Sequence, residues 1–284
     1  MADSLLDPRT IRSLAAELDL RPTKQRGQNF VHDANTVRRI VAASGIGADD
    51  VVLEIGPGLG SLTLGLLEVA QAVVAVEIES SLAARLPRTA AERLPERASR
   101  LRVIEADALA VDSVPDPQPT AVVANLPYNV SVPVLLHVLA TFAGVGRGLV
   151  MVQAEVADRL VAPPGSRTYG VPSAKLAWYC SSRRVGSVPP TVFWPVPNVD
   201  SGLVELVRRE PPATTATREQ VFAVVDAAFS QRRKMLRQAL SGLFGSSAAA
   251  SAAMISAGVD PQARGEVLGI ADFARIAETV PSVG

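Results

Sequence analysis

The sequence holds few of the residues that form disulfides or bind metals. Its 284 residues include one cysteine, Cys180, and two histidines. A single cysteine cannot form an internal disulfide, and without a cysteine–histidine cluster we predict no metal site. Cys180 lies in an apolar stretch and is expected in the core.

The sequence also lacks long apolar runs and any net charge. No stretch of 18 apolar residues is present, so we predict no membrane span. The first residues include Asp3, Asp7 and Glu17 and lack the apolar centre of a secretory signal, so the cytoplasm is the expected compartment. The sequence contains 28 basic residues (lysine and arginine) and 28 acidic residues (aspartate and glutamate). The overall charge therefore favours no class of partner, and an RNA site would have to be a local basic patch. The sequence does not indicate an oligomeric state, and a monomer is expected by default.

A glycine-rich turn follows an apolar run at residues 51–60, VVLEIGPGLG. This pattern predicts a buried strand and then a tight turn that lets the backbone approach a nucleoside-type cofactor, although structural loops share it. Ser61 stands where a dinucleotide-binding turn needs its third glycine, and no Gly-Lys-Ser/Thr of a P-loop follows. The E-x-G-x-G form resembles the first motif of S-adenosylmethionine-dependent methyltransferases.

Further predicted strands alternate with helical patterns, at residues 73–77, 101–104, 121–124 and 149–152. Such alternation is typical of βαβ units, so we predict an α/β fold with a Rossmann-like, doubly wound parallel sheet. A last pair of strands, 184–188 and 202–207, is expected as an edge hairpin. Helices are expected from Asp7-Pro8 to about Leu20 and over residues 35–44.

The alternation stops at a linker-like stretch, residues 210–217, EPPATTAT. Only helical patterns follow, beginning with a helix expected over residues 219–242. We therefore predict a methyltransferase-like domain over residues 1–209, which includes the N-terminal helix and a basic loop, and a small all-helical domain over residues 210–284.

Acids follow two successive predicted strands. Glu77 lies 21 residues after Gly56, where a carboxylate can accept hydrogen bonds from ribose hydroxyls. Asp107 follows the next strand and is placed to accept a hydrogen bond from the exocyclic amine of an adenine. Either acid alone is also typical of a solvated strand end, but both together with Gly56 and Gly58 indicate a cofactor site.

The most specific motif is NLPY, residues Asn125, Leu126, Pro127 and Tyr128, at the end of the fourth strand of the alternation. An adenine amine is nearly planar and a poor nucleophile. Acceptance of its two N–H groups by the Asn125 side chain and a backbone carbonyl of Leu126-Pro127 would favour a pyramidal, reactive nitrogen. Tyr128 would stack on the base. The alternative is an ordinary turn with a core tyrosine.

Six segments in this order resemble the ribosomal RNA adenine N6,N6-dimethyltransferase family, closest to its bacterial small-subunit branch: QNF, EIGPGLG, VEIE, EAD, NLPYN and VFWPVPNVDS. The resemblance covers essentially the whole chain, including FSQRRKMLRQAL in the tail. It implies S-adenosyl-L-methionine as the cofactor. The contacts it implies are at Asn29, Val31, Gly56, Glu77, Asp107 and Asn125.

The resemblance also implies a substrate: two adjacent adenosines in a hairpin loop near the 3′ end of small-subunit rRNA, in the immature 30S particle. The F-x-P-x-P segment of the family maps onto Phe193, Pro195 and Pro197. Phe193 would close the face of the flipped base opposite Tyr128, or it is a core residue under the hairpin.

The candidate for phosphate contacts is a basic cluster in the tail, formed by Arg232, Arg233, Lys234 and Arg237. The alternative is that this run of charged residues is only a solvent-exposed face. Two alternative functions remain open. The first shares the catalytic motifs, and the second acts on the same ribosomal particle. One is an erythromycin-resistance-type methyltransferase of 23S rRNA. The other is an assembly or binding factor on the pre-30S particle. A DNA adenine methyltransferase is disfavoured because it usually has aspartate where Asn125 stands.

Overall fold

The computed structural model describes residues 4–20, 29–128, 130–232 and 234–281. The chain forms two compact units: Met1–Ala157 with Ser182–Arg208, and Asp158–Ser181 with Arg209–Gly284. Each unit is described by itself below.

Two N-terminal helices form as their end signals predict. Helix α1 (Pro8–Glu17) has Asp7 at its N-cap, and the Asp7 carboxylate accepts a 2.7 Å hydrogen bond from the backbone N–H of Thr10. Helix α2 (Ala34–Ser44) ends at Gly45, which has a φ of +63°. Both helices bury their apolar face, as expected from the sequence pattern.

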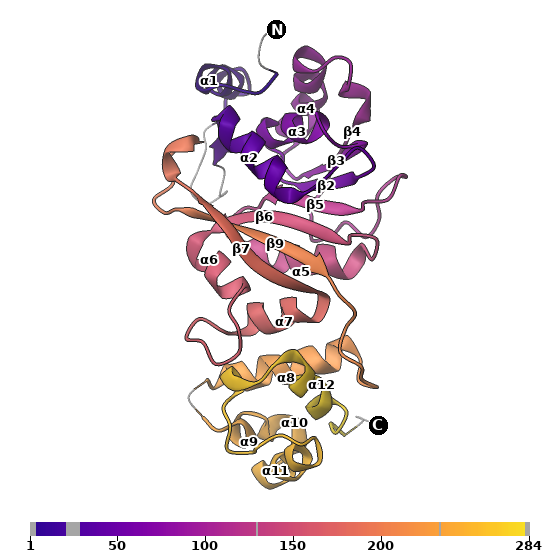
Figure 1. Cartoon of the computed structure of the whole chain (residues 1–284), viewed down its shortest axis with the longest axis vertical. Helices are drawn as coiled ribbons and strands as arrows, with labels where there is room; N and C mark the ends of the chain where they lie inside the picture. Colours follow the sequence, from indigo (N-terminus) through magenta and orange to yellow (C-terminus); the bar gives the residue numbers. More distant parts are fainter. Residues whose placement is uncertain (1–3, 21–28, 129, 233, 282–284) are drawn as a thin grey trace. The chain divides into compact units, whose positions relative to one another are not determined.

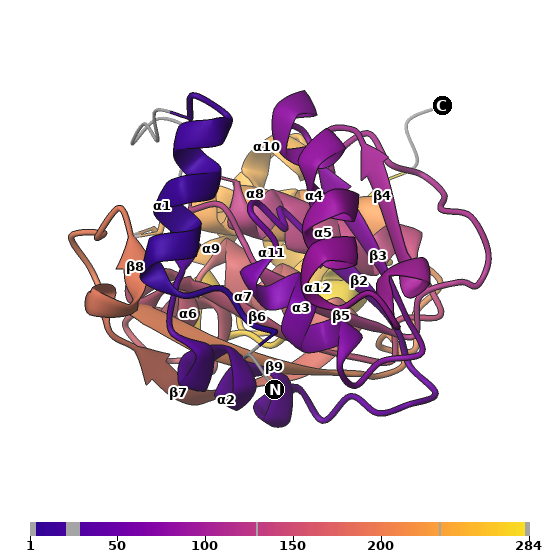
Figure 2. The same ribbon diagram turned by 90° about the horizontal axis from the view of Figure 1, so that it is seen from above.

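The first unit is built on a seven-stranded sheet (Figures 1 and 2). Its strands are β2 (Val51–Ile55), β3 (Ala72–Glu77), β4 (Leu101–Glu105), β5 (Ala121–Asn125), β6 (Arg147–Gln153), β7 (Cys180–Val188) and β9 (Ser201–Arg208). The order across the sheet is β4-β3-β2-β5-β6-β9-β7. Strands β2 to β6 pair in parallel, and β9 pairs antiparallel to β6. The predicted Rossmann-like α/β sheet is confirmed, with the last two strands together at one edge.

Crossover helices connect the parallel strands: α3 (Ser61–Leu67), α4 (Ser80–Arg93) and α5 (Ser131–Thr141), with α6 (Ala154–Leu160) after β6. Figure 2 shows α3 and α4 beside β3 and β4, against which they pack. Every residue of β2, β3 and α3 is buried, which explains their nearly unbroken apolar sequence.

The parallel register brings the carboxyl ends of the central strands to one edge. Ile55 pairs with Val76, Glu77 with Glu105, and Asn125 with Met151. Because every parallel strand points the same way, the loops that follow these ends face one region.

A two-stranded sheet near this edge was not expected from the sequence. Strand β1 (Phe30–Val31) pairs antiparallel with β8 (Phe193–Trp194), so that Val31 lies opposite Phe193. The rings of Phe30 and Trp194 are stacked with centroids 6.4 Å apart. The pairing joins two segments that lie more than 160 residues apart in the chain.

The second unit is helical: α7 (Val171–Tyr179), α8 (Arg218–Ser230), α9 (Leu236–Ala239), α10 (Ser241–Phe244), α11 (Ser247–Ser256) and α12 (Ile270–Ala277). Short 3-10 turns occur in the chain at Ala98–Arg100, Pro190–Val192 and Gly265–Val267. The continuous helix expected over residues 219–242 is wrong, because α8 ends at Ser230. Beyond it, the backbone N–H of Leu236 donates to the Ala263 carbonyl instead of continuing a helix.

The second unit includes residues 158–181, which the sequence-based boundary near residue 210 assigned to the first domain. The reason is aromatic packing between helices. Trp178 and Tyr179 of α7 each make an edge-to-face contact with Phe222 of α8, with ring centroids 6.2 and 6.1 Å apart. Cys180, the first residue of β7, is buried as predicted.

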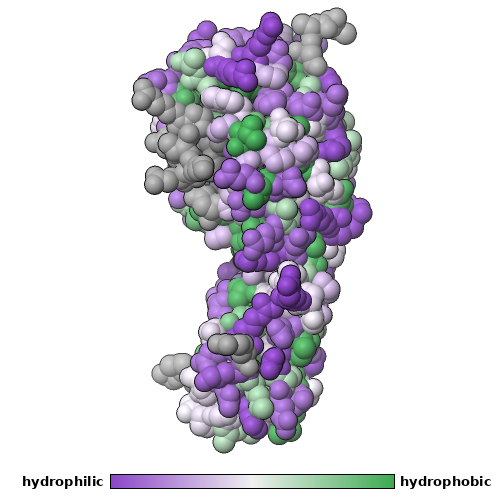
Figure 3. All heavy atoms as spheres, turned by 90° about the vertical axis from the view of Figure 1, so that its left-hand side faces the viewer, coloured by the Kyte–Doolittle hydropathy of each residue, from purple (hydrophilic) through white to green (hydrophobic). Residues whose placement is uncertain are grey.

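No helix among the described residues is long and apolar enough to cross a membrane. The same residues hold no group of three or more histidine, cysteine, aspartate or glutamate side chains arranged to bind a metal ion. On the face shown in Figure 3, apolar side chains form separate spots among polar ones rather than one broad patch.

Candidate functional site

The turn after β2 requires glycine at two positions. Gly58 has a φ of +59°, and a Cβ there would lie 2.8 Å from the ring of Phe30. Gly60 has a φ of +97°, and a Cβ there would lie 2.6 Å from Leu86. Any side chain would therefore strain the backbone and clash with packed groups. The turn packs tightly against β1 on one side and α4 on the other.

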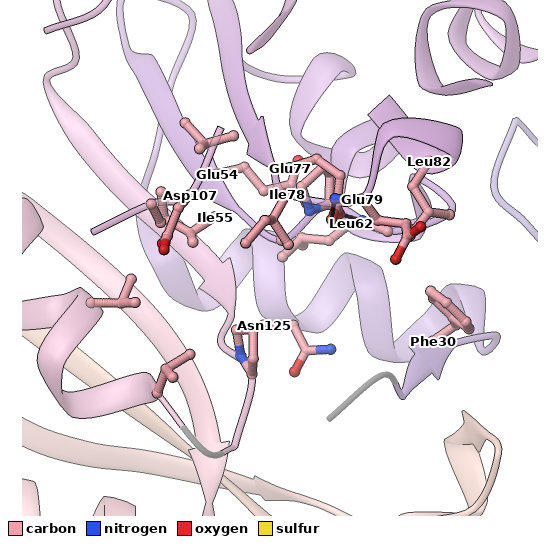
Figure 4. Close-up of a pocket in the computed structure, with 18 of the residues that line it drawn as sticks. Phe30, Glu54, Ile55, Leu62, Glu77, Ile78, Glu79, Leu82, Asp107 and Asn125 are labelled. Atoms are coloured by element: carbon pink, nitrogen blue, oxygen red, sulfur yellow. Dashed lines mark hydrogen bonds between the residues drawn. The ribbon is translucent and has the colours of Figure 1, made fainter. Parts of the chain in front are cut away.

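A cavity of about 470 Å³ lies over this turn, at the carboxyl ends of β2, β3, β4 and β5 (Figure 4). All seven residues that the sequence assigned to the cofactor line it: Asn29, Val31, Gly56, Gly58, Glu77, Asp107 and Asn125. Figure 4 shows Glu77, Asp107 and Asn125 around one space although they come from three different strand ends. The cavity falls within the range of small-molecule sites.

Glu77 is held by backbone donors at the end of β3. One carboxylate oxygen accepts a 3.0 Å hydrogen bond from the N–H of Gly58, and the other accepts one of 3.0 Å from Glu79. Burial raises the pKa of Glu77, while these N–H groups act in the opposite direction. The N–H of Ile78 also donates to this carboxylate. Because a carboxylate has about four acceptor positions, it retains capacity for a hydroxyl of a bound molecule.

Asp107 and two apolar residues form the part of the wall nearest β4. Oδ1 of Asp107 accepts a 2.9 Å hydrogen bond from the backbone N–H of Leu109. Ile78 is 67% exposed and Leu109 is 41% exposed, which is unusual for large apolar side chains. Both line the cavity. They suit the face of a flat base. Ile78 directly follows the end of β3, and Leu109 lies in the loop after β4.

Asn125 ends β5 at the cavity wall. Its Nδ2 donates a 3.1 Å hydrogen bond to the backbone carbonyl of Asn29. A carbonyl partner requires the amide nitrogen on that side, so Oδ1 is turned away from Asn29. Pro127 also lines the cavity and lies over the glycine turn, because a Cβ on Gly56 would lie 3.7 Å from its ring.

The other predicted catalytic side chains are not on the cavity wall. Leu126 is buried, and its N–H donates a 3.0 Å hydrogen bond to the Met151 carbonyl. The hydroxyl of Tyr128 is 2.9 Å from the Oγ of Ser201. Phe193 is fully buried in the hydrophobic core, opposite Val31 of β1, which agrees with the alternative interpretation of a core residue. The two rings expected on either side of a base thus do not face each other across the cavity.

Glu54 is a buried acid at the cavity whose environment the sequence did not reveal. It is 1% exposed, and Thr63 Oγ1 donates a 2.7 Å hydrogen bond to it. Burial, together with the charge of nearby Glu77, raises its pKa to about 8. Near neutral pH the side chain is therefore mostly an uncharged carboxylic acid.

The basic cluster of the tail lies in the second unit. Arg232 forms a 3.0 Å ion pair with Glu266 and donates to the Arg167 carbonyl at 2.6 Å. Lys234 is exposed and Arg237 is half-buried. Arg233, like Gln28 of the QNF segment, lies outside the described residues. Part of the positive charge of Arg232 is thus already balanced within the unit.

The fold and the cavity together define a class of protein. A glycine turn follows the first strand of the large sheet, an acid ends the next strand, another follows the third, and an asparagine ends β5. This is the arrangement of an S-adenosylmethionine-dependent methyltransferase.

Comparison with known proteins gives the family. Residues 20–281 match the model of the ribosomal RNA adenine dimethylase family, and the chain belongs to this family. It is accordingly an enzyme, an S-adenosylmethionine-dependent methyltransferase that acts on ribosomal RNA.

Two curated relatives span nearly the whole chain. The ribosomal RNA small subunit methyltransferase A of Streptomyces avermitilis is 65% identical over 277 residues, covering 97% of this chain and 94% of that protein. The protein of the same name from Cutibacterium acnes is 63% identical over 285 residues, covering 99% and 96%.

Two solved structures share the fold. A dimethyladenosine transferase from Plasmodium falciparum matches with a TM-score of 0.72 at 23% identity, covering 87% of this chain and 95% of that one. The 23S rRNA methyltransferase ErmE matches with a TM-score of 0.63 at 26% identity, covering 89% and 99%.

The residues of the cavity fit the cofactor of this family. S-adenosyl-L-methionine carries an adenine, a ribose with two hydroxyls and a positively charged sulfur. The cavity offers apolar walls, the acceptor oxygens of Glu77 and Asp107, and the backbone of a glycine turn. These groups match the base and the hydroxyls of the cofactor.

Proposed function

We propose that this enzyme transfers methyl groups from S-adenosyl-L-methionine to the N6 amines of two adjacent adenosines in the 3′-terminal hairpin loop of 16S rRNA. The product is N6,N6-dimethyladenosine, made on the immature 30S particle in the cytoplasm by a monomer. The names of the curated relatives support small-subunit rRNA as the target.

Within the cavity, each wall residue has a proposed role toward the cofactor. Glu77 accepts hydrogen bonds from the ribose hydroxyls, and Asp107 accepts one from the adenine amine. Gly56 and Gly58 allow close backbone approach. Asn29 and Val31 cover the cavity from the N-terminal side, since both line it.

The orientation of the Asn125 amide is the observation that carries the proposal. Because Nδ2 donates to the Asn29 carbonyl, Oδ1 is the atom left to accept an N–H of the substrate amine. A carbonyl of the Leu126-Pro127 segment accepts the second N–H. With both N–H groups held, the nitrogen becomes pyramidal and its lone pair points along one direction.

The cofactor, when bound, supplies an electrophilic methyl group on sulfur. With the amine held in this way, its nitrogen would be placed to accept that methyl group, and the methylated amine would release its extra proton to solvent. No strong base is needed, so positioning and hydrogen bonding provide most of the rate enhancement. Phe193 is proposed to stack on the flipped base after local rearrangement, because it is buried in this structure, and Tyr128 is proposed to stack on the base from its present position.

The helical tail is proposed to contact the RNA backbone. Arg232, Arg233, Lys234 and Arg237 supply positive charge that is suited to phosphates. Such contacts position the enzyme and leave the choice of base to the cavity of the first unit.

Methyl transfer from labelled S-adenosyl-L-methionine tests the proposal. Unmethylated 30S particles, 50S particles and duplex DNA are incubated separately with the enzyme, and the RNA is digested to nucleosides. We expect label in N6,N6-dimethyladenosine of 16S rRNA alone. Label in 23S rRNA would instead indicate a resistance-type enzyme. No label, with the cofactor still bound, would favour the binding-factor alternative. Asn125→Ala serves as the inactive control.

A further inference from the structure

The hydroxyl of Tyr128 has a specific partner in the sheet. It lies 2.9 Å from the Oγ of Ser201, the first residue of β9. Ser201 is 0% exposed, and its backbone lies in register with Gln153 of β6. A fully buried hydroxyl needs a partner, and Tyr128 is the side chain that provides it.

This contact spans a strand. Tyr128 belongs to the loop after β5, whereas β9 lies on the far side of β6 in the sheet order. Neighbouring strands are about 4.8 Å apart, so β5 and β9 are separated by about 10 Å. The side chain of Tyr128 therefore reaches across the end of β6, and its hydroxyl is fixed at the far side.

The loop is tied down at its other end by the backbone. The Leu126 N–H donates to the Met151 carbonyl of β6 at 3.0 Å. Between the two anchors lies Pro127, which covers the glycine turn at the cavity. Loss of the tyrosine anchor would free the segment that follows Asn125.

We propose that Ser201 is a positioning residue for methyl transfer: by bonding the Tyr128 hydroxyl, it holds the loop after β5 in the arrangement that presents Asn125 to the substrate amine. The proposal rests on the proposed function for its kinetic consequence, whereas the anchor itself can be measured without RNA. Burial also raises the pKa of Tyr128, so its hydroxyl stays protonated and able to donate near neutral pH.

Kinetics of Ser201→Ala, Tyr128→Phe and the double variant test the coupling. We expect kcat to fall about tenfold in each single variant, as for loss of one hydrogen bond, with the KM for S-adenosyl-L-methionine unchanged. Because the two residues share one bond, the double variant should also lose about tenfold rather than a hundredfold. A loss of kcat of about a hundredfold in the double variant, or an unchanged kcat in Ser201→Ala, would overturn the proposal.

Ser44→Ala is the matched control. Ser44 is also buried, and its Oγ donates one hydrogen bond, to the Val41 carbonyl at 2.6 Å in α2. It does not line the cavity. Ser44→Ala should lower stability without lowering kcat. If kcat fell in this variant as much as in Ser201→Ala, the effect of Ser201→Ala would be explained by general destabilisation, and the proposal would be refuted.

Hydrogen exchange of the free enzyme separates this proposal from the proposed function. In Ser201→Ala and Tyr128→Phe, the Leu126 amide should exchange faster than in the wild type, while amides of β3 should be unchanged. Unchanged exchange at Leu126 would refute the anchor even if the wild type methylates 16S rRNA. Faster exchange in a wild-type background that methylates no RNA would support the anchor and refute the proposed function alone.

Discussion

Replacement of Glu54 by glutamine should change how the stability of the first unit depends on pH. Glu54 is 1% exposed, and burial raises its pKa from 4.5 to about 8. Below pH 4.5 the carboxyl is protonated in both the folded and unfolded states. Above that pH it ionises when the chain unfolds, so its contribution to folded stability is lost as the pH rises toward 8.

The size of the effect follows from the pKa difference. A shift of about 3.5 units corresponds to about 5 kcal/mol, at 1.36 kcal/mol per unit. At pH 5 the unfolded carboxyl has only begun to gain from ionisation, which costs the fold about 1 kcal/mol, whereas at pH 8.5 the cost is between about 4 and 5 kcal/mol. Glutamine does not ionise and can still accept the hydrogen bond from Thr63. The advantage of Glu54→Gln should therefore be about 4 kcal/mol larger at pH 8.5 than at pH 5.

Urea denaturation at the two pH values measures this difference. Trp194 lies in the first unit and Trp178 in the second, so Trp178→Phe in every variant makes the fluorescence report the first unit alone. Glu96→Gln, which removes an exposed carboxyl, is the control and should behave like the parent at both values. If the shift in urea midpoint caused by Glu54→Gln were the same at pH 5 and pH 8.5, the buried, protonated state of Glu54 would be refuted.

Three further predictions concern the site and the fold. Gly58→Ala places a Cβ 2.8 Å from the Phe30 ring at a φ of +59°, so calorimetry should show S-adenosyl-L-methionine binding weakened at least about tenfold; unchanged affinity would contradict the tight turn. Asn125→Ala should lower kcat by about 100-fold or more, and activity within a few-fold of wild type would refute its role as acceptor. Phe273 is 0% exposed in the second unit, so Phe273→Ala should destabilise that unit by about 3–5 kcal/mol in thermal denaturation while cofactor affinity stays unchanged.

The parts of the site that the sequence predicted are those encoded by short, contiguous patterns. The glycine turn, Glu77, Asp107 and Asn125 each follow an apolar run, and parallel strands bring such positions to one edge without further information. Their position around one cavity follows from the order of the strands in the sheet. The α/β fold was predictable for the same reason, because helix and strand periodicities alternate clearly along the first half of the chain.

What the sequence did not predict depends on partners far along the chain. The pairing of β1 with β8 and the contact of Tyr128 with Ser201 arise from tertiary packing, and the same packing decides between the two positions that the sequence left open for Phe193. The end of α8 at Ser230 is similar, since beyond it the backbone N–H groups of Leu236 and Arg237 donate to the carbonyls of Ala263 and Pro261. The local periodicity of a sequence does not indicate partners that lie far along the chain.

The order of the strands also orders the proposed roles. Asp107 follows β4, Glu77 ends β3, the glycine turn follows β2, and Asn125 ends β5, which is the order of these strands across the sheet. If Asp107 meets the adenine and Glu77 the ribose, the next strand end along the same edge must face the sulfur side of the cofactor. Asn125 stands one strand further, and its amide is oriented by Asn29. The residue proposed to hold the substrate amine therefore follows the cofactor site in space because β5 follows β2 in the sheet.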